Sequence, residues 1–184
     1  MLNSFGARRL ESPPAGCYTL CHMEEQDIMR EQAQILTDRA QRHQMHGELG
    51  DAIALYRRSL AVYPTPEAHT YLGWAYSQMD RYDEAIAECE KAIALDPTFG
   101  NPYNDIGAYL IEMDRYEEAV AWLERATAAP RYDTPQFPYV NLGRAYEEMN
   151  QPYRALACYD RALGIAPLYL PATWAKWRLL SRLN

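Results

Sequence analysis

A seven-residue segment recurs along this chain at nearly constant spacing. Residues 79–85 read MDRYDEA and 113–119 read MDRYEEA, while 149–155 carry a looser copy, MNQPYRA. An upstream copy at 47–52 keeps only part of the motif. The alanines that end the four copies are 33, 34 and 36 residues apart: Ala52, Ala85, Ala119 and Ala155. Such a period predicts an array of similar structural units, each packed against its neighbours.

Each unit contains two stretches of helical periodicity. In the second unit, Leu72 and Tyr76 share one helix face, and Ala85, Cys89 and Ala92 mark a second stretch. Proline stops a helix, and three units end in one: Pro64, Pro97 and Pro167. We therefore expect first helices near 24–46, 66–78, 101–112 and 136–148, and second helices near 49–62, 82–95, 116–128 and 152–165.

This pattern resembles the tetratricopeptide repeat, in which W-x2-L-G-x2-Y is followed by A-x3-F and then by P. The resemblance covers residues 33–167 and implies an all-α fold, a right-handed α-solenoid of antiparallel helix pairs. The expected units within a domain of residues 24–184 are about 33–65, 66–99, 100–135 and 136–169, followed by a capping helix at 171–182. Residues 1–23 are expected to form a poorly ordered leader.

Small residues recur at fixed places in this pattern. Glycine is costly inside a helix, yet each first helix of units two to four carries one: Gly73, Gly107 and Gly143. We interpret them as points where the second helix approaches closely. The turn between the two helices carries Asp80, Asp114 or Asn150, residue types that tolerate the left-handed backbone conformation.

Two departures from the repeat pattern are visible. The first unit has Arg39 and His43 where Leu and Tyr are usual, so it is interpreted as a polar N-terminal cap. Residues 130–135 add two positions between units three and four, which predicts a longer loop at that junction.

The composition excludes several function classes. With 18 Lys and Arg against 25 Asp and Glu, the net charge is −7, which disfavours nucleic acid and anionic membranes as partners. No apolar run is long enough for membrane insertion. The four cysteines do not form a disulfide framework, so we expect a cytoplasmic protein.

No catalytic motif is evident in the sequence. It lacks a glycine-rich phosphate loop, a G-x-S-x-G elbow and an H-E-x-x-H pair. His43 and His46 are three residues apart but are interpreted as surface histidines, because no Cys or carboxylate lies at ligand spacing. We therefore expect no enzyme activity, no cofactor and no metal.

The resemblance implies that the first helices line a concave groove, where a partner segment binds. The groove residues expected to contact it are Tyr71, Trp74, Gln78, Asn104, Asp105, Glu112, Asn141, Arg144 and Glu148. Tyr71 and Trp74 are interpreted as aromatic anchors, although Trp74 could instead pack on the neighbouring first helix. Asn104, Asn141 and Arg144 could bind an extended backbone; the asparagines could also be ordinary members of the repeat pattern.

The charges at the groove positions indicate the partner's chemistry. Arg144 is the only basic residue there, against six acidic ones: Asp38, Glu67, Asp105, Glu112, Glu147 and Glu148. Some tetratricopeptide repeat proteins bind the C-terminal carboxylate of a partner through lysines on successive repeats, and this sequence lacks lysines at the groove positions. An acidic groove with aromatic patches predicts a basic or basic–apolar protein segment as the partner.

Two alternative functions remain open at this point. The last helix has more apolar residues than a capping helix needs, notably Trp174 and Trp177, which would suit a self-assembling structural protein and hence a homo-oligomer. A secretion-type chaperone for a single client is the other, because similar small acidic repeat proteins can have that role.

Overall fold

The computed structural model describes residues 15–132 and 134–183, with side chains from residue 25 onward. This part of the chain contains nine α-helices and no named strand. The helices are α1 (Ala15–Met45), α2 (Leu49–Val62), α3 (Pro66–Ser77), α4 (Tyr82–Leu95), α5 (Asn101–Glu112), α6 (Tyr116–Ala128), α7 (Gln136–Glu148), α8 (Pro152–Ile165) and α9 (Leu170–Leu183). None of them is long and apolar enough to cross a membrane.

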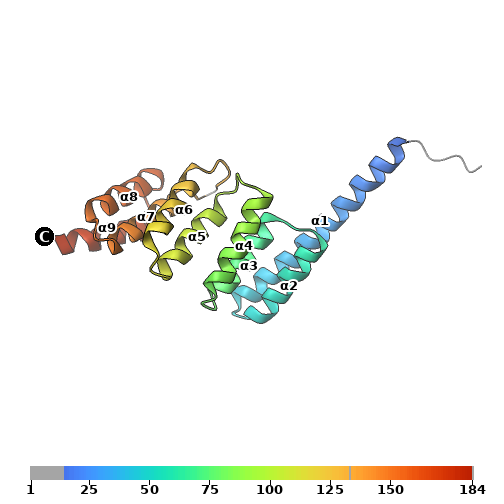
Figure 1. Ribbon diagram of the computed structural model, residues 1–184, viewed down its shortest axis with the longest axis horizontal. Helices are drawn as coiled ribbons and strands as arrows, with labels where there is room; N and C mark the ends of the chain where they lie inside the picture. The colour runs from blue at the N-terminus through green and yellow to red at the C-terminus, as the bar shows by residue number, and fades with distance from the viewer. Residues whose placement is uncertain (1–14, 133, 184) are drawn as a thin grey trace, which may run out of the picture.

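The helices form an elongated stack of antiparallel pairs (Figure 1). α1 pairs with α2, α3 with α4, α5 with α6 and α7 with α8, and each second helix also packs on the first helix of the next unit. α9 follows as a single helix on α8. This arrangement confirms the predicted all-α solenoid of helix pairs.

α1 begins at Ala15, earlier than the expected start near residue 24. Its N-terminal part projects beyond the stack (Figure 1). Of the expected leader 1–23, residues 1–14 lie outside the described part of the chain, and the remainder belongs to α1. Pro13 and Pro14 immediately precede the helix in the sequence, where a missing backbone N–H costs little.

The interior of the first unit is partly polar. Thr37 of α1 and Ser59 of α2 hydrogen-bond through their hydroxyls at 2.9 Å, and Ser59 also donates to the Ala33 carbonyl. The Tyr56 hydroxyl donates to Gln44, which is buried as well. Each of these buried groups has a partner, so the polar interior carries no desolvation penalty from an unpaired group.

The turns inside the units have the backbone conformation that the sequence predicts. Asp80, Asp114 and Asn150 have φ values of 58°, 59° and 56°. The Tyr82 hydroxyl donates to the Asp80 carboxylate at 3.0 Å, and Tyr116 contacts Asp114 in the same way. In two successive units, the aspartate with positive φ is therefore hydrogen-bonded by the tyrosine that begins the second helix.

The glycines of the first helices mark points of close approach between paired helices. A Cβ on Gly73 would lie 2.9 Å from the Ala85 carbonyl oxygen, and one on Gly107 would lie 2.5 Å from Leu123 Cγ. At Gly143 the added atom would overlap the Tyr159 ring. The predicted role of these glycines is confirmed. One buried core runs from the first unit to α7, and Ala155, Tyr159 and Leu179 form a second cluster between α8 and α9.

The junction between α6 and α7 folds back onto earlier units. The Arg131 amide donates to the Thr98 carbonyl at 3.0 Å, and the Gly100 amide donates to the Arg131 carbonyl at 2.8 Å. The Arg131 side chain forms ion pairs with Glu67 and Asp96 at 2.8 and 2.9 Å. The extra residues of this loop therefore connect the third unit to the second.

We expect Gly143→Ala to lower the free energy of unfolding by about 1–3 kcal/mol, because the added methyl group must displace the Tyr159 ring. Gly164→Ala in α8 is the matched control, since its Cβ would meet no atom within 4 Å. That substitution should instead raise stability by roughly 0.5–1 kcal/mol. Urea denaturation of both variants measures the difference; equal stabilities would contradict the close-approach interpretation.

Candidate protein-binding groove

The first helices line one side of the stack. Besides their own partners, they contact one another across units: α1 with α3, α3 with α5 and α5 with α7. In a curved stack this places them on the inner side. We use the term groove for the inner surface of α3, α5 and α7. Eight of the nine residues expected to contact the partner lie on these helices, and the ninth, Gln78, directly follows α3: Tyr71, Trp74, Gln78, Asn104, Asp105, Glu112, Asn141, Arg144 and Glu148.

The aromatic end of the groove lies on α3. Trp74 is 41% exposed, so much of its indole is open to solvent. Tyr71 is half-buried and stacks on Tyr56 of the first unit, with ring centroids 6.2 Å apart. Gln78 accepts a hydrogen bond from Gln44 Nε2 at 2.8 Å. Tyr71 and Gln78 are therefore partly engaged in holding units one and two together, whereas Trp74 offers free surface.

A row of polar side chains connects α5 and α7. Asn141 Nδ2 donates to Asn104 Oδ1 at 3.0 Å, and Asn104 Nδ2 donates to Asp105 Oδ1 at 3.3 Å. A guanidinium nitrogen of Arg144 lies 3.4 Å from Asn141 Oδ1. Asn104 is buried, while Asn141 and Arg144 are half-buried. The two asparagines thus hold neighbouring first helices together, and Asn141 and Arg144 remain accessible from the groove.

Several of the acidic side chains counted from the sequence are ion-paired. Glu112 pairs with Arg144 at 2.7 Å and Glu67 with Arg131 at 2.8 Å. Glu147 is almost fully buried and accepts from Arg178 and Arg182 of α9. Counting only first-helix positions missed Arg131, Arg178 and Arg182, which come from the loop before α7 and from the last helix. Glu148 is exposed and has no ion-pair partner in the part of the chain that the structure describes.

Asp105 is half-buried in the groove, near the loop before α7. Burial raises the pKa of its carboxyl group to about 7, against the opposing effect of the hydrogen bond from Asn104. Burial also raises the pKa values of Tyr132 and Cys89, and the nearby Asp105 carboxylate raises both further. Tyr132 belongs to the loop before α7 and lies against Gly100, so the loop contributes to the cover. A carboxyl group in this position is partly protonated near neutral pH.

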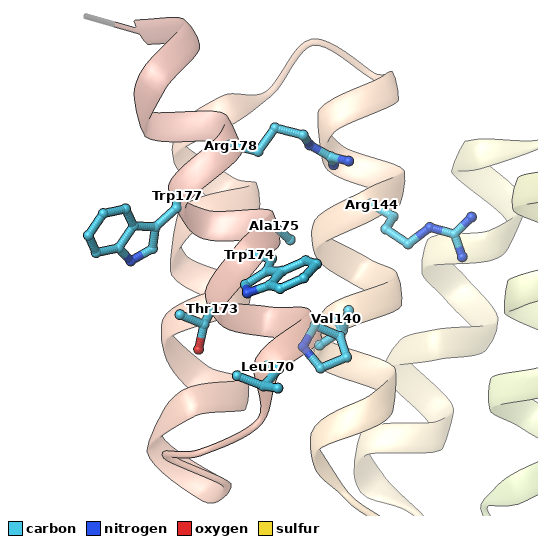
Figure 2. Close-up of a pocket in the computed structure, with 9 residues that line it drawn as sticks. Val140, Arg144, Leu170, Thr173, Trp174, Ala175, Trp177 and Arg178 are labelled. Carbon is cyan, nitrogen blue, oxygen red and sulfur yellow. The ribbon is translucent and has the colours of Figure 1, made fainter.

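A pocket of about 880 Å³ lies where the inner surface reaches α9. Its lining includes Val140 and Arg144 of α7 together with Leu170, Trp174 and Arg178 of α9. Figure 2 shows Trp174 beside Val140, with both arginines on the same side. Trp177 also belongs to the lining of the pocket, but its indole points away from these residues. The two tryptophans expected to form one self-association surface therefore point in different directions.

Three side chains at the turn between α1 and α2 could hold a metal ion. Ligand atoms of His43, Glu48 and Asp51 lie within 4.8 Å of one another, and His43 Nδ1 is 2.5 Å from a Glu48 oxygen. The sequence analysis did not predict this group, because the three residues become neighbours only when the turn between α1 and α2 places Glu48 beside His43. The group is exposed on its carboxylate side, and the His43–Glu48 hydrogen bond accounts for its geometry.

The two cysteines whose side chains the structure describes are free thiols. Cys89 is fully buried between α3 and α4, where it faces Gly73, and Cys158 is half-buried on α8. Both act as small apolar residues of the helix interfaces, as the sequence pattern suggested.

Models of the tetratricopeptide repeat match residues 66–99, 88–121 and 138–167. A comparison with curated protein sequences finds no match. Among solved structures, PilF of Pseudomonas aeruginosa is similar, with a TM-score of 0.77 and 23% identity over 85% of this chain and 70% of PilF. PilW, a type IV pilus biogenesis factor, has a TM-score of 0.71 and 25% identity over 76% of this chain and 64% of PilW.

A third similar structure is MamA, with a TM-score of 0.65 and 24% identity over 77% of this chain and 82% of MamA. The first repeat domain of Spaghetti (RPAP3), solved with the HSP90 peptide SRMEEVD, has a TM-score of 0.59 and 20% identity over 64% of this chain and 92% of that one. Repeats of this kind mediate protein–protein interactions and typically have no catalytic role. The matched repeats and the stacked helix pairs show that the chain belongs to the tetratricopeptide repeat proteins.

Proposed function

We propose that this protein is an interaction scaffold, or adaptor, that binds a segment of a partner protein in the groove. The observation that carries the proposal is Trp74, a large aromatic side chain that is 41% exposed on the inner side of the stack. The helix pairs do not need this indole for their core, whose first-helix members on α3 are Leu72, Ala75 and Tyr76. An aromatic residue left open in a concave surface is well suited to anchor a partner.

The energy available at this anchor is substantial. Covering the exposed part of an indole removes roughly 100 Å² of mainly apolar surface from water, which contributes about 2 kcal/mol to binding. Tyr71 lies three residues before Trp74 on the same helix, and its stacking on Tyr56 holds it in place. Because Tyr71 is already ordered by this contact, a partner loses little entropy in using it.

The polar row would fix the course of the bound segment. Asn141 and Arg144 are half-buried, and both can hydrogen-bond a peptide backbone from the groove side. Their positions are set in advance by the bonds to Asn104 and Glu112. The RPAP3 domain, which was solved with an HSP90 peptide, supports the idea that a fold of this kind can accommodate a peptide segment.

We propose a segment with apolar and basic side chains as the partner. Apolar side chains would contact Trp74 and Tyr71, and a basic side chain would meet Glu148, which is exposed and unpaired among the described residues. The net charge of −7 favours the approach of a basic partner at low ionic strength. Because Glu67, Glu112 and Glu147 already have arginine partners, the apolar contacts carry more of the affinity than the charge count suggested.

We place the protein in the cytoplasm, where thiols stay reduced. The free thiols of Cys89 and Cys158 support this proposal.

Affinity capture with the wild-type chain as bait tests the proposal. We expect Trp74→Ala to weaken binding of the captured partner at least about tenfold, because the indole contact supplies more than 1.4 kcal/mol. Tyr153→Ala is the matched control: this aromatic residue is 81% exposed at the start of α8, a second helix outside the groove. If Trp74→Ala and Tyr71→Ala retain every partner that Tyr153→Ala retains, groove binding is wrong.

The chemistry of the segment has its own test. With the captured segment in hand, Glu148→Lys should lower the association rate severalfold at low salt and less at high salt, because exposed charges act mainly by screened attraction. Glu90→Lys on the outer surface of α4 makes the same charge change as a control. Equal rates for the two variants would contradict a basic contact at Glu148.

The state of Asp105 can be measured without a partner. Its pKa is near 7 in the folded chain against 3.8 ordinarily, so the folded state binds more protons between these pH values and loses stability as the pH rises through them. Asp105→Asn removes the titrating carboxyl group, so the variant does not lose this stability as the pH rises. We expect the variant's stability relative to wild type to increase by about 1–3 kcal/mol from pH 5 to pH 8 in urea denaturation. A pH-independent difference would mean that Asp105 titrates normally.

A further inference from the structure

The inner side of the stack opens between α7 and α9. α1 contacts α3, α3 contacts α5 and α5 contacts α7, whereas α9 packs on α8 and makes no comparable backbone contact with α7 among the described residues. The pocket of about 880 Å³ lies in the space between these two helices. Pockets that bind ligands usually have volumes of about 300–1,000 Å³, so this space is large enough for part of a partner segment.

The repeat pattern explains why this space is open. Between α5 and α7, the hydrogen bond from Asn141 to Asn104 bridges neighbouring first helices. One unit later the equivalent residues are Ala175, which follows Asn141 by 34 positions, and Val140, which follows Asn104 by 36. Both are small apolar residues without hydrogen-bonding side chains, and both line the pocket. No polar bridge therefore closes the gap between α7 and α9 at this position.

The lining combines apolar walls with basic side chains. Trp174 is 73% exposed and Leu170 is 62% exposed, and both line the pocket together with Val140. The charged residues of the lining are Arg144 and Arg178, which lie on the same side of Trp174 (Figure 2). No carboxylate belongs to the lining among the residues that the structure describes. A large apolar group with an adjacent negative charge matches this surface.

The two arginines have hydrogen-bond donors to spare. Arg178 donates to Glu147 Oε1 at 3.1 Å and Arg182 to Glu147 Oε2 at 3.4 Å, so two guanidinium groups share one almost fully buried carboxylate. Arg144 pairs with Glu112 at 2.7 Å. The Arg178 side chain is 62% exposed, and a guanidinium group has five N–H donors. Arg178 can therefore bind a further carboxylate without giving up its contact with Glu147.

The acidic side chains near Arg144 lie on the opposite side of α7. Glu112, Asp114 and Glu148 line a separate pocket of about 260 Å³ between α5 and α7, and Arg144 lines both pockets. The inner surface thus changes from acidic to basic across α7. A segment that follows this surface meets negative charge at Glu148 and positive charge at Arg178.

We propose that the pocket between α7 and α9 binds an internal peptide segment in which a large apolar side chain is next to Asp or Glu. The apolar side chain packs beside Trp174 and Val140, and the carboxylate accepts charge-assisted hydrogen bonds from Arg178. The inference builds on the proposed function, because the pocket adjoins the groove at Arg144 and extends its binding surface onto α9. A further helix pair in a longer stack would pack on the far side of α9 and leave this space open.

A phage-displayed library of random peptides tests this inference. Each peptide is fused to the coat protein at its C-terminus, so that no free C-terminal carboxylate is present. The library is first depleted on Trp174→Ala and then selected on the wild-type chain, which leaves peptides that need this indole. We expect these peptides to carry an aromatic or large aliphatic residue next to an acidic one. A selection that yields no peptides, or only peptides without an acidic residue, would overturn the inference.

A synthetic peptide from this selection measures the two contacts by fluorescence polarisation. Trp174→Ala should weaken binding at least about tenfold, and Arg178→Gln about three- to tenfold with a smaller dependence on salt. In Arg178→Gln the buried Glu147 keeps Arg182 as its partner, so far-UV circular dichroism should match that of wild type.

The controls remove the same chemical groups from second helices. Tyr153→Ala removes an aromatic side chain that is 81% exposed on α8, and Arg58→Gln removes an exposed guanidinium group on α2. Both should bind the peptide as wild type does. If Arg178→Gln binds as tightly as Arg58→Gln, no carboxylate contacts Arg178 and the inference is wrong.

Trp74→Ala separates this inference from the groove proposal. Peptides that bind Trp74→Ala as they bind wild type, but are lost on Trp174→Ala, would support the pocket even if the groove proposal fails. If instead every selected peptide is lost on Trp74→Ala and retained by Trp174→Ala, the groove proposal stands and the pocket inference fails.

Discussion

The rest of the structure depends on the close approach of paired helices at one small residue of each first helix. Gly73 faces Ala85 and Cys89, Gly107 faces Leu123, and Gly143 faces Tyr159. Glycine weakens a helix by about 1 kcal/mol, so its presence there must be offset by packing. This close approach lets side chains of the second helix fill the space over the first helix. The buried side chains form one core from the first unit to α7 and a second cluster between α8 and α9. It also fixes which helix faces inward, and therefore which residues can form the groove.

Features set by neighbours in sequence could be predicted from the sequence, whereas features set by the curvature of the stack could not. Apart from the start of α1, the helix limits follow from local patterns and the structure has them, as it has the left-handed turns at Asp80, Asp114 and Asn150. The ion pair between Arg131 and Glu67 joins residues 64 positions apart and depends on how the loop before α7 folds back. The cover over Asp105 depends on the same loop through Tyr132. No spacing rule describes the course of such a loop, so the groove's charge was overestimated.

The loop before α7 links the shape of the groove to its electrostatics. Its arginine neutralises Glu67 and Asp96, and its tyrosine lies against Gly100 at the start of α5. Covering Asp105 disfavours the charged carboxylate there, so that the middle of the groove is less acidic than its composition suggests. The accessible features that remain are the Trp74 indole, the amide of Asn141 and the exposed carboxylate of Glu148. Such a surface selects a partner by apolar contact and backbone hydrogen bonds first, and by charge second.

The two ends of the stack meet the problem of an uncovered helix face differently. Repeat arrays usually end in polar capping units, because the terminal helix has no neighbour on one side. The first unit has a polar, fully hydrogen-bonded interior at Thr37, Ser59 and Gln44, and its outer positions include Arg39. α9 instead pairs its charges with α7 and α8, and its two tryptophans are each 73% exposed. Exposed apolar area of this size has a free-energy cost in water that a cap would avoid.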